Sequence, residues 1–109
     1  MEKTSIAQAA KILEDLVKGL DEAYWQANSM ETKDLFYDLV SAVNGEIIEV
    51  GKLSVQDHDL EYEPITAHFR LARNKLNQVR KNINETVLNT PVAIRLEKLV
   101  TELLAASPL

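Results

Sequence analysis

Apolar residues recur every three or four positions in four stretches of the chain, the spacing that places side chains on one face of an α-helix. The stripes cover residues 6–27, 36–50, 65–87 and 92–104. The connections between them are mostly short, which favours antiparallel packing of neighbouring helices. The pattern therefore predicts an all-α fold, an antiparallel up-down four-helix bundle, in a single domain spanning residues 1–109.

Capping residues indicate where these helices begin. Ser5 is followed three residues later by Gln8, which fits a capping box at the start of the first helix. Pro64 is expected as the first residue of the third helix, because its missing N–H costs nothing at that position. Thr90 is expected to cap the fourth helix, with Pro91 as its first residue.

The second stripe allows two interpretations. Asn44 and Gly45 form a dipeptide that is favoured in hairpin turns, and the β-branched run 47–50 follows it. An α+β fold with a short strand after Gly45 is therefore the alternative. We prefer a continuous helix, because a single strand without a partner would leave its backbone groups unpaired.

The stripes also predict the core and the ends of the bundle. The expected core residues are Leu13, Leu20, Val43, Ile47, Leu76, Val79, Ile83, Leu96 and Leu99. Tyr24, Trp25, Phe36 and Tyr37 are expected to meet at one end of the bundle. We interpret Trp25 and Tyr37 first as packing residues of that end, and alternatively as an aromatic contact for a partner.

Charge is distributed unevenly along the chain. The net charge is −5, with 17 acidic and 12 basic residues. Residues 1–64 hold fourteen acidic and five basic residues, whereas residues 65–109 hold three and seven. In the third helix, Arg70, Arg73, Asn77 and Arg80 fall on one stripe at steps of three and four. We call these four residues the basic stripe.

Three interpretations of the basic stripe are open. It can pair with acidic helices of the same chain, where surface pairs contribute only about 0–1 kcal/mol each. It can bind an acidic protein face, including that of a second copy in a homodimer, aided by exposed flanks such as Ile48, Leu71 and Ile94. It can bind nucleic acid, although the sequence pI of about 5.0 argues against this.

Several chemistries are excluded or unsupported. The chain has no cysteine and three glycines, which excludes thiol catalysis and a glycine-rich phosphate loop. No Glu-x-x-His motif of a di-iron bundle occurs, and we read the run 57–59, which contains His58, as a solvated loop rather than a metal site. Glu46 and Glu49 form an isolated E-x-x-E pair without further acids on the third helix before Glu85, so no magnesium site is expected.

One histidine has a coherent chemical role. The run from His68 to Ala72 resembles the motif of histidine phosphotransfer domains, which are acidic four-helix bundles of about this size. The small residue four positions after the histidine is present as Ala72. The motif has a basic residue three positions after the histidine, where this chain has Leu71; the basic residue is displaced to Arg70, one position earlier, or to Arg73, two positions later. The resemblance implies a phosphotransfer carrier centred on His68.

The sequence as a whole predicts a small non-enzymatic protein that acts as a protein–protein interaction or assembly module. The expected partner is a protein or a second copy, bound through Arg70, Arg73, Asn77 and Arg80. We expect no cofactor, no metal and no small-molecule ligand. Neither a membrane-spanning stretch nor a secretory leader is recognisable, so a cytoplasmic location is expected.

Overall fold

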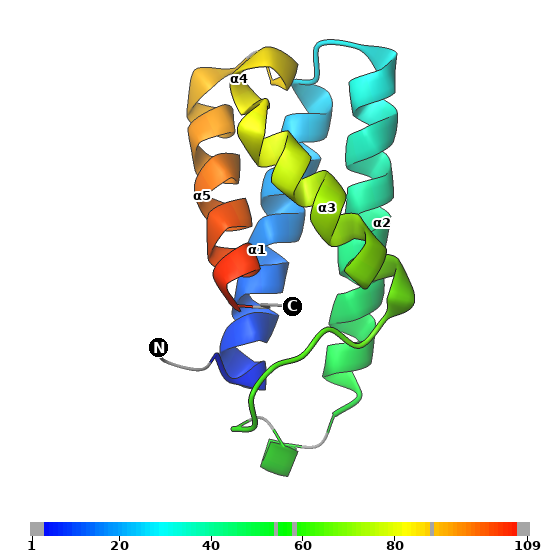
Figure 1. Cartoon of the computed structure of the whole chain (residues 1–109), viewed down its shortest axis with the longest axis vertical. Helices are drawn as coiled ribbons and strands as arrows, with labels where there is room; N and C mark the ends of the chain where they lie inside the picture. The colour runs from blue at the N-terminus through cyan, green and yellow to red at the C-terminus, as the bar shows by residue number, and fades with distance from the viewer. Residues whose placement is uncertain (1–3, 54, 58, 88, 107–109) are drawn as a thin grey trace.

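The structure is a computed structural model that describes residues 4–53, 55–57, 59–87 and 89–106 (Figure 1). Within this part of the chain the elements are α1 (Ile6–Trp25), α2 (Met30–Gly51), the short 3-10 turn η1 (Val55–Asp57), α3 (Ala67–Lys81), α4 (Ile83–Thr86) and α5 (Thr90–Ala106). The described residues contain no β-strand. The predicted all-α class is therefore confirmed.

The four long helices alternate in direction, and α3 runs obliquely across the others (Figure 1). The main contacts of α1 are with α2 and α5, and α3 contacts the same two helices. Seven of the nine predicted core residues are buried, whereas Ile47 and Leu99 are only partly buried and pack against the core. The amphipathic spacing thus predicted most of the core correctly.

The first helix begins as predicted and ends two residues early, at Trp25. The capping box is present, because the Ser5 hydroxyl accepts from the Gln8 N–H at 3.2 Å and Gln8 Oε1 accepts from the Ser5 N–H at 2.9 Å. Gly19 lies where α1 meets α5. A Cβ atom at Gly19 would stand 2.7 Å from Cδ1 of Leu99, so glycine permits this close approach.

The second helix is continuous through Asn44 and Gly45. The alternative of a strand after Gly45 is therefore wrong. Val43 and Val50 are both buried on the same side of this helix. The apolar stripe keeps its helical spacing through the glycine, and burial of that stripe outweighs the local preference of the dipeptide for a hairpin turn.

Both ends of the third predicted helix differ from expectation. Pro64 is not its first residue, because α3 begins at Ala67 with Thr66 as its cap, and the Thr66 hydroxyl accepts from the Phe69 N–H at 3.1 Å. The helix then breaks at Asn82 instead of continuing to Val87. The short helix α4 follows, and it keeps Ile83 buried, so the apolar spacing passes through the break unchanged.

The cap of the last helix is displaced by one residue. Thr90 is already helical, and the Asn89 side chain performs the capping role, since its Oδ1 accepts from the Val92 N–H at 3.1 Å. Pro91 is consequently the second helical residue. Asparagine is at least as good a cap as threonine, which accounts for the shift.

Candidate functional site

The aromatic residues at the junction of α1 and α2 divide into buried and exposed members. Phe36 is fully buried, but Trp25 is 68% exposed and Tyr37 is 69% exposed. The preferred interpretation of Trp25 and Tyr37 as packing residues is therefore wrong. The reason is that Trp25 follows Tyr24, which is partly buried against the core, and Tyr37 follows the buried Phe36, and adjacent helical positions point about 100° apart.

These side chains surround a small surface depression, which we call the aromatic hollow. It has a volume of about 250 Å³ and is lined by Asp21, Tyr24, Trp25, Tyr37 and Val40. The rings of Tyr24 and Trp25 are perpendicular, with their centroids 5.1 Å apart. Two helices thus supply three aromatic rings and one carboxylate to the same place.

A cation already lies over two of these rings. The Nζ atom of Lys33 is 5.0 Å from the centroid of the Tyr24 ring and 5.6 Å from that of Trp25. Both distances are within the range of cation–π attraction, which arises from the negative ring face. The electrostatics of the aromatic hollow therefore favour positive charge.

A second depression continues from the aromatic hollow along α2. It has a volume of about 480 Å³ and is lined by Tyr37, Val40, Ser41, Asn44, Gly45 and Ile48. Tyr37 and Val40 line both depressions, so the two adjoin. Ile48 is 60% exposed at the far end, and the whole surface is open and largely apolar.

The basic stripe is largely engaged within its own chain. Arg70 donates from Nε and Nη2 to the Pro64 carbonyl, at 3.0 and 2.6 Å. Arg80 Nη2 donates to Asn77 Oδ1 at 2.7 Å, and Arg73 Nε is buried without a hydrogen-bond partner among the described residues. Of the four residues only Arg70 is exposed, which limits what the stripe presents to a partner.

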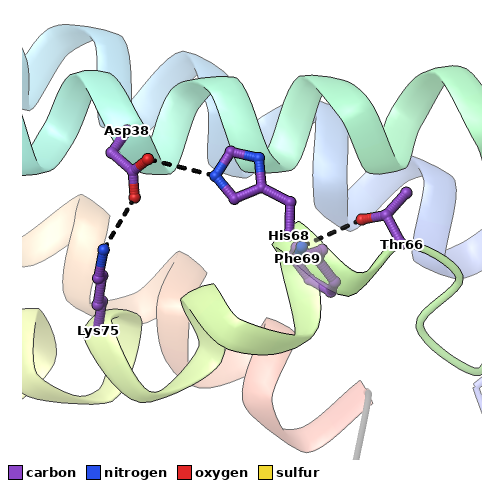
Figure 2. A network of polar contacts seen from close by, with 5 residues as sticks. All are labelled: Asp38, Thr66, His68, Phe69 and Lys75. Atoms are coloured by element: carbon purple, nitrogen blue, oxygen red, sulfur yellow. Dashed lines mark hydrogen bonds and ion pairs between the residues drawn. The ribbon is translucent and has the colours of Figure 1, made fainter.

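His68 lies beside a carboxylate that joins α2 to α3 (Figure 2). Its Nε2 atom is 3.2 Å from Asp38 Oδ1, and Lys75 Nζ donates to Asp38 Oδ2 at 3.1 Å. The hydrogen bond from Lys75 is the largest cause that lowers the pKa of Asp38, and His68 adds to it. The His68 side chain is 49% exposed, so the imidazole is accessible, but its Nε2 atom is already paired.

A buried carboxylate on α2 forms hydrogen bonds with the segment that precedes α3. Glu46 is completely buried, and its Oε2 accepts from the Tyr62 hydroxyl at 2.5 Å and from the Ile65 N–H at 2.8 Å. Its Oε1 accepts from the N–H of Thr66, the α3 cap, at 2.9 Å. The carboxylate thus lies at the positive end of the α3 dipole. Burial, followed by the hydrogen bond to Glu46, raises the pKa of Tyr62 far above its ordinary value.

Comparisons with family models, with curated proteins and with solved structures each found nothing similar. Within the described ranges, no helix is long and apolar enough to cross a membrane. The same part of the chain contains no cluster of three or more His, Asp or Glu side chains that could hold a metal ion; His58 lies outside it.

Sequence reasoning missed Glu46 as a structural residue, although a signal was present. Glu46 lies at helical spacing with Ala42, Val43 and Val50 on the buried face of α2. An acid on such a face must find donors, because a buried carboxylate without them is very costly. The donors come from backbone groups of a loop, and backbone groups carry no sequence signature.

Proposed function

We propose that this protein is a non-enzymatic interaction module that binds a protein partner through the surface formed by Trp25, Tyr37 and Ile48. The observation that carries the proposal is the exposure of Trp25 and Tyr37 around a depression in the surface. Trp and Tyr are the residues that most often dominate the energy of protein interfaces. Grouped exposed apolar side chains of this kind mark interaction surfaces more often than single ones do.

The proposal predicts that this surface selects the partner. A tagged Trp25→Ser/Tyr37→Ser variant should lose a protein that the wild type captures from host lysate. A control variant, Leu60→Ser, changes an exposed apolar residue in the connection between α2 and α3, which belongs to neither proposed contact surface, and should retain it. Binding must then be reproduced with the two purified proteins. Equal binding by the wild type and the Trp25→Ser/Tyr37→Ser variant would overturn the proposal.

The basic stripe remains a proposed second contact, for a protein partner or for a second copy. Sedimentation of the wild type and an Arg70→Glu/Arg73→Glu variant tests the homodimer: a dimer that the variant converts to monomer supports it, and a wild-type monomer refutes it. The same variant tests nucleic-acid binding. Salt-sensitive binding of DNA or RNA at about 50 mM salt, lost in the variant, would favour that alternative instead.

A phosphotransfer role for His68 is the second candidate function. It is favoured by the exposure of the imidazole and by Lys75, which shares Asp38 with it and could attract a phosphoryl group. Incubation with phosphorylated receiver domains or acetyl phosphate should then place an acid-labile label on His68. No label on the wild type, or equal labelling of a His68→Gln variant, would contradict it.

A further inference from the structure

We propose that the aromatic hollow is a site for an arginine side chain displayed by the protein partner. This inference rests on the proposed function, and it specifies which chemical group of the partner the surface recognises. The hollow is lined by three aromatic side chains and by one carboxylate, that of Asp21. A planar guanidinium can stack on an aromatic ring while its N–H groups pair with a carboxylate.

The charge of the lining favours a cation. Asp21 is the only Asp, Glu, Lys or Arg among the five lining residues, and it is exposed, so it can reach a ligand. The surrounding half of the chain, residues 1–64, carries fourteen acidic and five basic residues. A basic partner would therefore be attracted to this side of the molecule before it makes contact.

Lys33 provides direct support from within the chain. Its ammonium group lies over Tyr24 and Trp25, yet Lys33 does not line the hollow itself. The rings thus hold a cation in the folded protein, and the depression beside them stays open. The intramolecular ammonium also repels a second cation nearby, so Lys33 limits how tightly an arginine binds.

The size of the hollow sets the kind of ligand. A volume of about 250 Å³ is slightly below the range of whole small-molecule pockets, about 300–1,000 Å³, and suits one side chain. An acidic side chain in the hollow would be repelled by Asp21, and a purely apolar one would leave the Asp21 carboxylate without a partner. An arginine satisfies the carboxylate and the rings together.

The fluorescence of Trp25 reports on the site directly, because it is the only tryptophan in the chain. We would titrate the full-length protein with a blocked glycine–arginine–glycine peptide and with the same peptide containing citrulline. Citrulline keeps the shape of arginine but carries no charge. The arginine peptide should bind about 2-fold to 30-fold more tightly, the range expected for a cation–π contact.

Four variants locate the effect. Asp21→Asn and Tyr37→Leu should each weaken binding of the arginine peptide, whereas Glu14→Gln, an exposed acid on the same helix outside the hollow, should leave it unchanged. Lys33→Gln should tighten binding, because it removes the competing positive charge. An unchanged affinity in the Lys33 variant would refute a site at these rings.

The remaining outcomes separate this inference from the proposed function. Equal binding of the arginine and citrulline peptides would show an apolar docking surface without charge recognition, which overturns the inference and leaves the proposed function intact. Binding of neither peptide would overturn the inference as well. The proposed function would then be decided by the Trp25→Ser/Tyr37→Ser capture experiment alone.

Discussion

Replacing Glu46 by alanine should be among the most destabilising single changes in this protein. The substitution removes the acceptor of three hydrogen bonds, from Tyr62, Ile65 and Thr66. The Tyr62 hydroxyl is buried and cannot regain water, whereas the two backbone N–H groups are only partly buried and can do so in part. Hydrogen bonds to a charged group contribute about 1.5–3 kcal/mol each, and an unsatisfied buried donor costs about 1–3 kcal/mol.

We therefore expect Glu46→Ala to lower the free energy of unfolding by about 3–5 kcal/mol, a large part of the roughly 5–15 kcal/mol of an average domain. Urea unfolding followed by circular dichroism should show the midpoint falling by about 2 M. Glu46→Gln should lower the stability less, because the amide oxygen of glutamine can still accept a hydrogen bond. It should still destabilise the protein, because the amide NH₂ group would face an N–H donor. Glu46 and Tyr62 should also show coupling in a double-mutant cycle with Tyr62→Phe.

Glu49→Ala is the matched control. Glu49 lies on the same helix three residues later, and it pairs with Lys52 at 2.9 Å on the protein surface. Its loss should cost no more than about 1 kcal/mol. If Glu46→Ala were no more destabilising than Glu49→Ala, this would refute the reasoning that the hydrogen bonds of Glu46 to the segment before α3 stabilise the fold.

Three further predictions concern the core, the second helix and the buried phenol. Leu76 is fully buried, so Leu76→Ala should cost about 2–5 kcal/mol in urea unfolding, and a loss below 1 kcal/mol would contradict the core assignment. Gly45→Ala should raise the melting temperature, since a Cβ there meets no atom within 4 Å and alanine favours the helix by about 0.5–1 kcal/mol. Because the pKa of Tyr62 is raised in the folded protein, the contribution of Tyr62 to stability is complete below the ordinary tyrosine pKa of about 10. The contribution declines above that pH, because there the Tyr62 phenol ionises in the unfolded chain but not in the folded protein. Absorbance at alkaline pH, compared with that of a Tyr62→Phe variant, should therefore show the Tyr62 phenol ionising only when the protein unfolds; its ionisation in the folded protein would disprove this.

The accuracy of the sequence interpretation depended on how local each interaction is. The Ser5–Gln8 box joins residues three apart, so the chain itself predicts it. The break at Asn82 could not be predicted, because Ile83 stays in phase with the apolar stripe of α3 and the spacing shows no interruption. Pro64 was misplaced for a different reason: the residues after it bond to Glu46 on another helix, and that contact moves the helix start to Ala67.

The candidate site shows the same limit. The spacing rule located Trp25 and Tyr37 near each other but could not tell outward from inward orientation at the end of a bundle. The basic stripe was found from spacing alone, yet its hydrogen bonds to Pro64 and within the stripe depend on side-chain conformations that spacing does not determine. Residue type and periodicity thus identified the candidates, whereas exposure and pairing required the folded chain.

The connection between α2 and α3 is bonded to two different helices at its far end. The Ile6 N–H donates to the Leu60 carbonyl at 2.9 Å, the Tyr62 N–H donates to the Thr4 carbonyl at 2.8 Å, and Glu46 binds the residues that follow. A peptide bond cleaved near Gln56, ahead of these contacts, would leave the start of the second fragment hydrogen-bonded to the first fragment at Thr4, Ile6 and Glu46. Such a nicked chain should stay assembled under native conditions, and its two halves, expressed separately, should reconstitute the fold by fragment complementation.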